Sequence, residues 1–392
     1  MTERATTRPR ARVVGGSMRH NPRVIDAQHP AATHVTPYDR LEASDDRIER
    51  LLASGAQREA LVDYFGTAAY AELVVLARRA ARTRGGPRVY ILPGIMGSQL
   101  GRPRGHGLPR DILWLDPIDI AIGRLREIVM RPHTPVQAMG VILFHFLKLK
   151  LRLAIAGFSP RLFAYDWRRS VVEAGRAFAA EVARDASPRI HVVAHSMGGL
   201  VARAALALPG QERIERLVML GTPNSGSFAP VQALRGTYAV VRKLAALDQV
   251  HSAETLASEV YSTFPGLYEL LPAEGTTALD LFDPSAWPAT GPRPDPALLA
   301  AARSSLRGLA PGDERMVLIA GHARPTVTGV RRAGAEFEYV VTRDGDGTVP
   351  LALAGLPGVR TYYAREGHSE LTTNGTIASA VMVGCTASIL AT

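Results

Sequence analysis

Short apolar segments alternate with stretches of helical periodicity from residue 87 onward, and this alternation limits the possible folds more than any other feature of the 392-residue sequence. Such alternation is typical of a parallel β-sheet with helices packed on both of its faces. The sequence therefore predicts an α/β fold with a mostly parallel central sheet. Six segments are expected as strands: RVYILPG, RLFAYDW, RIHVVAHS, RLVMLGTP, RMVLIAG and VRTYYA.

Two inserts interrupt this alternation, at about residues 101–160 and 225–305. Inserts of this length in an α/β fold usually form caps or lids over the site. The first contains VILFHFLKLKLRLAIAGF, whose apolar density raises the alternative of membrane contact. Because Lys148, Lys150 and Arg152 interrupt it, the sequence favours a core helix of the sheet.

The chain before residue 87 divides into two parts. Residues 1–38 have no apolar period and carry six arginines in their first 23 positions, so we expect a disordered basic tail. A tail of this charge can contact anionic lipid or nucleic acid, although a solvated leader is the simpler interpretation. Residues 39–86 contain helix start and stop signals and predict short helices. Residues 87–392 then form the main domain with its two inserts.

Composition narrows the class of protein further. Hydrophobic residues make up 46% and charged residues 21%, which is ordinary for a globular protein, and the net charge is +10. The sequence contains neither a charge-free apolar run of 18 residues nor a signal-peptide pattern. The single cysteine, Cys385, excludes an intrachain disulfide. We therefore expect a cytoplasmic location, with peripheral membrane attachment as an alternative.

The segment IHVVAHSMGGLVARAAL, residues 190–206, holds the candidate nucleophile. A strand that ends at Ser196 and turns at once into a helix resembles the nucleophile elbow G-x-S-x-G, which exposes the serine hydroxyl on a sharp turn. Ala194 and Gly198 occupy the two small-residue positions, so the pattern departs from the motif by one methyl group. An ordinary serine in a glycine-rich turn is the alternative. The order of strand, elbow and helix, with partners downstream, favours a catalytic serine.

An activated serine of this type needs an acid and then a histidine later in the chain. Among His251, His322 and His368, the sequence favours His368, because it follows both an apolar strand and the candidate acids. The acid lies in EYVVTRDGDGTVP, where we choose Asp346 over Asp344. An Asp-Gly hairpin turn would explain one of these aspartates. A calcium loop is a further alternative, but no glutamate follows at the required spacing.

Two backbone N–H groups are needed to stabilise the oxyanion of such a reaction. Met197 follows the nucleophile directly and can supply one of them. Ile95 follows the Pro-Gly turn in RVYILPGIMGSQL and can supply the other. A simple Pro-Gly turn would also account for this loop if it stood alone.

Seven motifs stand in one order along the chain: LPGIMGSQL, YDWR, AHSMGGLVAR, LGTPNSGS, FPGLYELLP, DGDGTVP and GHSEL. Together they resemble the lecithin:cholesterol acyltransferase family of α/β-hydrolases, which includes phospholipases and bacterial lipases, over about residues 88–372. The family's secreted members have a signal sequence and a disulfide-closed lid, and this sequence predicts neither feature. The resemblance implies an α/β-hydrolase fold, Ser196 as nucleophile, Asp346 as acid, His368 as base, and an oxyanion hole made by Ile95 and Met197.

The expected activity is hydrolysis of lipid acyl esters through an acyl-enzyme, without a metal or organic cofactor. A first alternative passes the acyl group to an alcohol, because one triad serves both reactions and the exclusion of water selects the acceptor. A second alternative is a partner-binding effector module with a vestigial elbow. The expected partners are a lipid or other acyl-ester substrate and, as a candidate, an anionic membrane surface; no nucleic acid is expected, and the sequence leaves a protein partner open.

The segment TLASEVYSTFPGLYELL, residues 255–271, leaves two structural alternatives open. Its apolar residues recur at partly helical spacing, so it could form a mobile face over the site that moves away at a lipid surface. The same pattern fits a segment that packs permanently on the hydrolase core. Helical periodicity by itself does not distinguish them.

Overall fold

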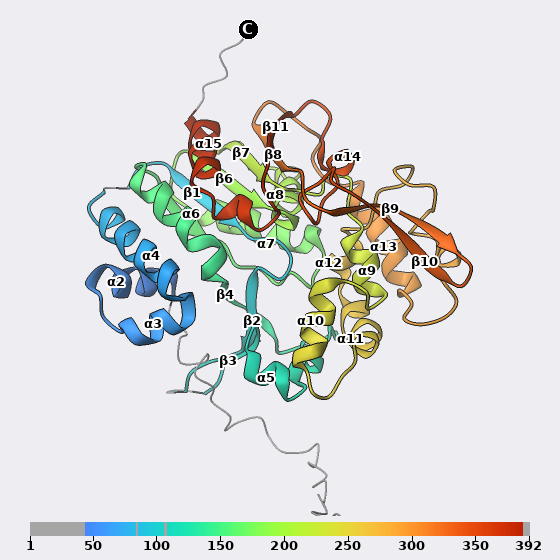
Figure 1. The fold of residues 1–392 in the computed structure, drawn as a ribbon. Coiled ribbons are helices and arrows are strands. Elements are labelled where there is room, and N and C mark those ends of the chain that lie inside the picture. Colours follow the sequence, from blue (N-terminus) through green and yellow to red (C-terminus); the bar gives the residue numbers. More distant parts are fainter. Residues whose placement is uncertain (1–43, 84, 106–107, 387–392) are drawn as a thin grey trace, which may run out of the picture. The chain divides into compact units, whose positions relative to one another are not determined.

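The computed structural model describes residues 44–83, 85–105 and 108–386, so the predicted disordered tail, residues 1–38, lies outside the described residues. A six-stranded sheet forms the centre, in the order β11-β8-β7-β6-β1-β5, and all neighbouring strands run parallel (Figure 1). This arrangement confirms the predicted α/β class with its parallel sheet. The strands are β1 (Arg88–Leu92), β5 (Ser159–Leu162), β6 (Ile190–His195), β7 (Ile214–Leu220), β8 (Met316–Gly321) and β11 (Arg360–Ala364).

One of the six predicted strands differs from its expected bounds. The segment RLFAYDW contributes only its first residues to β5, which ends at Leu162. Beyond that point the side chains bond to the part of the chain that follows β1: the Tyr165 hydroxyl donates to the Pro93 carbonyl at 2.7 Å, and the Trp167 indole donates to the Ser98 carbonyl at 2.9 Å. These contacts take the chain out of the sheet, which periodicity did not predict.

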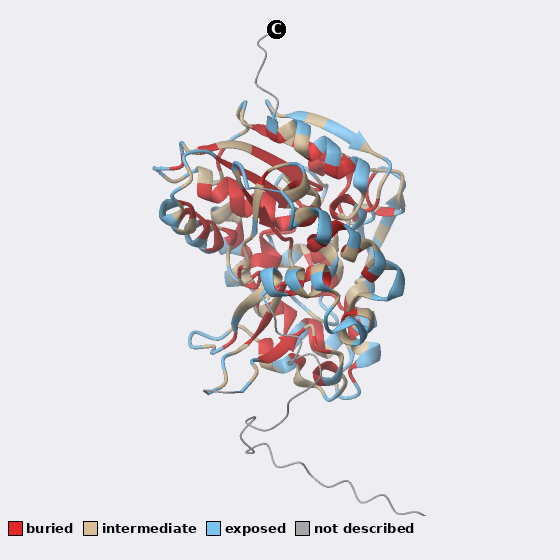
Figure 2. Cartoon of the chain, turned by 90° about the vertical axis from the view of Figure 1, so that its left-hand side faces the viewer, coloured by how far each residue is buried: buried red, intermediate tan, exposed pale blue. Residues whose placement is uncertain are grey.

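The strands are apolar on both faces because helices cover both sides of the sheet. In β1, Tyr90 and Leu92 belong to one core cluster, whereas Val89 and Ile91 belong to the opposite one. Helices α7 (Val171–Arg184) and α8 (Met197–Leu206) contribute to the first cluster, and α6 (Leu143–Ile155) and α15 (Gly375–Thr386) to the second. In Figure 2 the buried residues gather in the interior, whereas the exposed residues lie on the outer sides of the ribbon.

The first insert begins with a small antiparallel sheet in the order β3-β2-β4. Arg168 of the YDWR motif is fully buried and ion-pairs with Asp166 at 2.7 Å. Its guanidinium also donates to the carbonyls of Ile128 and Val136, so it anchors this insert as structural support. The elements are β2 (Ser98–Arg102), β3 (Asp111–Trp114), α5 (Pro117–Ala121), η1 (Arg124–Ile128) and β4 (Gln137–Val141).

The apolar segment of this insert is the core helix α6, which is buried on two sides. Phe146 and Leu149 face the sheet, whereas Leu147 and Leu151 face the N-terminal helices. Those helices are α2 (Asp45–Ser54), α3 (Arg58–Phe65) and α4 (Thr67–Ala80). Across the described ranges no single helix is long and apolar enough to span a bilayer. The helices α3 and α4, which are bent by 117° relative to each other, together have the length and composition of a span, but nothing else indicates one.

The second insert packs its apolar residues into the main core. In the segment 255–271, six side chains are each at most 3% exposed, and the Gly266 N–H donates to the Arg168 carbonyl. This burial favours the packed alternative over a mobile lid. The six are Leu256, Val260, Tyr261, Phe264, Leu267 and Leu271; the elements are α9 (Ala229–Leu234), α10 (Ala239–Leu247), α11 (Ala253–Glu259), η2 (Tyr261–Thr263), α12 (Pro265–Tyr268), η3 (Pro284–Ala286) and α13 (Pro296–Leu306).

The segment EFEYVVT, which precedes the candidate acid, forms one strand of a separate hairpin. It pairs antiparallel with its neighbour and not with the central sheet. The chain then returns towards the carboxyl edge of the sheet through a loop that contains both candidate aspartates. The elements are β9 (Thr326–Ala333), β10 (Glu336–Thr342), α14 (Leu351–Ala354) and, after β11, η4 (Glu370–Thr372).

Candidate active site

Ser196 sits at the junction of β6 and α8 in a strained backbone conformation, with φ 54° and ψ −127°. Positive φ is costly for a residue with a side chain and persists only where surrounding contacts enforce it. Here the Ser196 N–H donates to the Leu220 carbonyl at 2.8 Å, which fixes the end of β6 against β7. A Cβ on Gly198 would lie 2.5 Å from the Pro93 carbonyl oxygen. The turn therefore requires glycine there, whereas the Ala194 methyl packs in the core.

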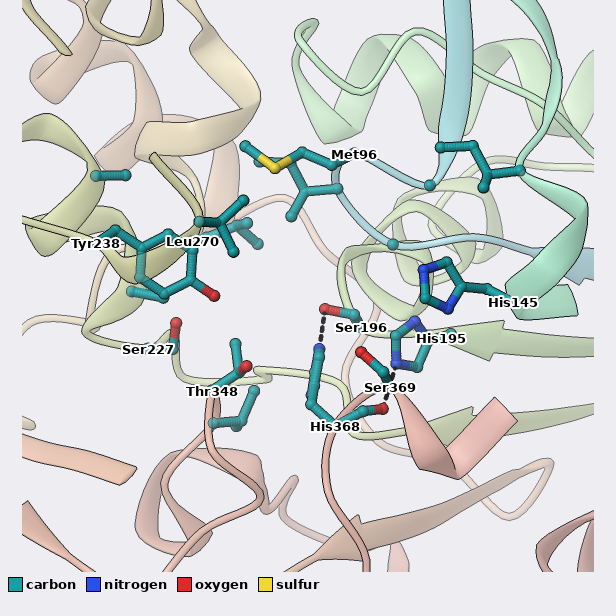
Figure 3. A pocket seen from close by; sticks show the side chains of 18 of the residues that line it. Met96, His145, His195, Ser196, Ser227, Tyr238, Leu270, Thr348, His368 and Ser369 are labelled. Atoms are coloured by element: carbon teal, nitrogen blue, oxygen red, sulfur yellow. Dashed lines mark hydrogen bonds between the residues drawn. The ribbon is translucent and has the colours of Figure 1, made fainter. Parts of the chain in front are cut away.

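The structure brings three predicted residues into one chain of hydrogen bonds. The His368 Nε2 atom lies 2.9 Å from Ser196 Oγ, and the His368 Nδ1 atom lies 2.7 Å from Asp346 Oδ2. Figure 3 shows the first of these contacts at the wall of a pocket. Ser196 follows β6 and His368 follows β11, so the carboxyl ends of two parallel strands present them at one edge of the sheet.

Asp346 is buried and held as a carboxylate. Its Oδ1 atom accepts hydrogen bonds from the N–H groups of Val349 at 2.7 Å and Thr348 at 2.9 Å. Burial raises the pKa of Asp346, but the charge and hydrogen bond of His368, together with these two amides, outweigh burial and leave the pKa below its usual value. An ionised carboxylate at this position favours the imidazole tautomer with its proton on Nδ1.

The rival residues do not reach Ser196. Asp344 is exposed, and its carboxylate accepts a hydrogen bond from the Thr342 hydroxyl at 3.3 Å. His251 bonds through Nδ1 to Asp248 at 3.0 Å. The backbone N–H of His322 donates to the Ala364 carbonyl, which fixes this residue beside β11.

The two predicted oxyanion donors lie in the loop after β1 and at the start of α8. Ile95 lines the pocket in the loop after β1, and Met197 is the first residue of α8. The first N–H groups of a helix lack intrahelical acceptors, and the helix dipole adds positive potential there. A Cβ on Gly94 would lie 2.7 Å from Ser196 Cβ, so glycine allows the β1 loop to approach the nucleophile. The role of these N–H groups stays a prediction.

The pocket beside Ser196 has a volume of about 380 Å³ and a mainly apolar lining (Figure 3). Among the described residues that line it there is no carboxylate, and Lys243 is the single lysine or arginine. Tyr238 also lines the pocket, and burial is the main cause of its raised pKa. The apolar walls include Trp114, Leu115, Phe146, Leu244, Leu267, Leu270 and Val349.

Acidic side chains that could share a metal ion occur away from this pocket. Across the described ranges, one such group is Asp45, Asp46 and Glu49. The ammonium group of Lys150, which is buried, already ion-pairs with all three at 2.6–3.0 Å. This group therefore has the character of a structural ion-pair cluster that joins α2 to α6.

Two histidines beside the site were missed by sequence reasoning. His195 lies next to the nucleophile, and its Nε2 atom is 2.9 Å from the His368 carbonyl oxygen (Figure 3). His145 lines the same wall from α6. The adjacency of His195 to Ser196 was a usable signal, but the partner is 173 positions away in the sequence.

Comparisons with known proteins agree with the α/β fold. A family described as the PGAP1-like alpha/beta domain matches residues 175–264, which contain the elbow. No curated protein matches the chain. The match covers residues 175–264 alone, and the resemblance to the lecithin:cholesterol acyltransferase family stays a prediction.

Three solved structures are similar in outline. A chain of the Tle4-Tli4 complex has a TM-score of 0.46 and 16% identity, over 77% of this chain and 98% of that one. The mature lipase BlEst2 of Bacillus licheniformis has a TM-score of 0.40 and 14% identity, over 76% and 90%. Phospholipase PlaB of Legionella pneumophila has a TM-score of 0.35 and 11% identity, over 77% and 60%. TM-scores and sequence identities this low do not indicate a shared activity.

Proposed function

We propose that this chain is a serine hydrolase that cleaves acyl esters, with Ser196 as nucleophile, His368 as general base and Asp346 as the orienting acid. The observation that carries the proposal is the continuous hydrogen-bonded chain from Ser196 Oγ through His368 to Asp346, at the wall of an apolar pocket. A serine hydroxyl is a weak nucleophile unless a base of this kind removes its proton.

The reaction starts when Ser196 Oγ attacks the ester carbonyl carbon while its proton passes to His368 Nε2. The Asp346 carboxylate stabilises the imidazolium that forms. The N–H groups of Ile95 and Met197 donate to the oxyanion of the tetrahedral intermediate. Collapse of this intermediate breaks the ester C–O bond, and His368 returns the proton to the departing alcohol.

Water completes the cycle. His368 Nε2 takes a proton from a water molecule as its oxygen attacks the acyl-serine carbonyl carbon. The second tetrahedral intermediate releases the carboxylic acid, and the proton returns to Ser196 Oγ. No metal or organic cofactor takes part in these steps.

Lipid esters are the substrate class that we propose for this site. The mainly apolar lining matches an acyl chain, whose burial is favourable by roughly 0.8 kcal/mol per methylene group. The presence of a partnered acid and base counts against a vestigial elbow, because a binding module has no need to keep them aligned with the serine.

A lipid screen by mass spectrometry tests the proposal. Purified protein is incubated with a mixed lipid extract, with and without an added long-chain alcohol, and Ser196→Ala serves as the control. The proposal predicts free fatty acid in both incubations with the wild type and none above background with the variant. A new ester that forms only with the alcohol would identify an acyltransferase instead. Unchanged lipids in every incubation would contradict the lipid assignment.

A further inference from the structure

His195 is the last residue of β6 and makes a contact that the proposed reaction does not use. Its Nε2 atom lies 2.9 Å from the main-chain carbonyl oxygen of His368. A carbonyl oxygen can only accept a hydrogen bond, so the His195 proton resides on Nε2 and this N–H is the donor.

The surroundings of His195 keep its ring neutral. Burial, followed by the neighbouring charge of His368, lowers the pKa of His195 to about 3. A Cβ on Gly94 would lie 3.3 Å from His195 Nδ1, so the β1 loop closes over this side of the ring. His195 therefore has one N–H donor at neutral pH, and the His368 carbonyl oxygen engages it.

Together with three other hydrogen bonds, this contact holds both the backbone and the ring of His368 in place. The His368 N–H donates to the Asp346 carbonyl at 2.8 Å, and its carbonyl accepts from His195. Both ring nitrogens are committed to the triad. The His195 ring also packs on the His368 ring, with centroids 4.7 Å apart, and Phe146 packs edge-on against His195 at 5.9 Å.

We infer that His195 is a positioning residue for the catalytic histidine: its Nε2–H holds the loop after β11 at the distance from the elbow at which His368 Nε2 reaches Ser196 Oγ. The inference rests on the proposed function. Because His195 directly precedes Ser196, one strand end determines the place of both the nucleophile and the base. A misplacement of reacting groups by about 1 Å can cost about 100-fold in rate.

Two substitutions separate the hydrogen bond from the packing of the ring. His195→Phe keeps an aromatic ring but removes the donor. His195→Gln lacks the ring, yet its amide N–H₂ can reach the position of Nε2. The matched control is His191→Phe, a buried histidine four residues earlier on the same strand whose ring packs on Phe158.

The experiment measures kcat and KM with p-nitrophenyl butyrate, a small neutral ester. Active sites are titrated with a fluorophosphonate, so that every rate refers to competent molecules. We expect His195→Phe to lower kcat per titrated site by about 10- to 100-fold while KM changes by less than about threefold. His195→Gln should recover most of this loss, and His191→Phe should keep the wild-type kcat per site.

Three results would overturn the inference: a wild-type kcat per site in His195→Phe, a Gln variant as slow as the Phe variant, or a loss explained wholly by fewer titratable sites. The last result would indicate a merely structural role. The Ser196→Ala variant is assayed in parallel. If it retains the wild-type rate, the proposed function itself fails; if it is inactive while His195→Phe is normal, only the inference about His195 fails.

Discussion

The elbow at Ser196 and the segment 255–271 border the same pocket but are built in opposite ways. Ser196 has a strained backbone conformation with a positive φ, and it presents one hydroxyl. The segment 255–271 instead buries six apolar side chains in short helical turns, and Leu267 lines the pocket. Strain of this kind is tolerated because packed regions supply the stability that it costs. Substitutions in the first region should therefore cost activity, and substitutions in the second should cost stability.

The largest expected effect is a loss of activity when Asp346, the proposed acid, is replaced. Asp346→Asn should lower kcat by about 10⁴-fold, because the amide no longer favours the productive tautomer of His368. Asp344→Asn is the matched control and should stay close to wild type, since this carboxylate is exposed. Ester hydrolysis measured for both variants checks the prediction. The reverse ranking of the two variants would move the acid two residues upstream.

The second effect should appear in stability. Phe264→Ala removes a fully buried ring and should lower the free energy of unfolding by about 3–5 kcal/mol. Leu247→Ala, at a side chain that is 40% exposed, should change it by less than about 0.5 kcal/mol. Urea unfolding measures both. If Phe264→Ala kept its stability and hydrolysed bulky esters faster, the segment would be a lid and the contrast between the two regions would fail.

The smallest effect concerns the pH dependence of stability at His195, beside the elbow. Because the pKa of His195 is lowered to about 3, from a usual value of about 6.5, the unfolded chain binds its proton between these pH values and the native chain does not. Stability therefore falls as the pH falls through this window, by up to about 1.4 kcal/mol per pH unit for this residue. Urea unfolding at pH 7 and pH 5 should show a shallower loss for His195→Phe than for wild type. Equal losses would contradict the lowered pKa.

Local backbone chemistry explains which parts of the site were predictable. The approach of Gly198 to the β1 loop leaves no room for a side chain, so the elbow imposes its residue pattern on the sequence. Asp346 and His368 follow strands in the chain order that this fold requires. The predicted roles of these residues in catalysis await experiment, but their proximity followed from motifs a few residues long.

Other features depended on contacts between distant residues. The segment 255–271 has the same periodicity whether it is mobile or packed, and only its neighbours in the fold decide between the two. The early end of β5 depends on bonds from Tyr165 to Pro93 and from Trp167 to Ser98. The hydrogen bond of His195 joins residues 173 positions apart. No short sequence pattern predicts any of these contacts.

Covalent labelling shows directly whether Ser196 is the activated nucleophile. Wild-type protein and Ser196→Ala are treated with a fluorophosphonate and digested, and the modified peptide is sequenced by mass spectrometry. We expect one phosphonylated residue, Ser196, and no labelling above background in the variant, which should retain the unfolding midpoint of the wild type. An adduct on another residue, or equal labelling of a folded Ser196→Ala variant, would contradict it.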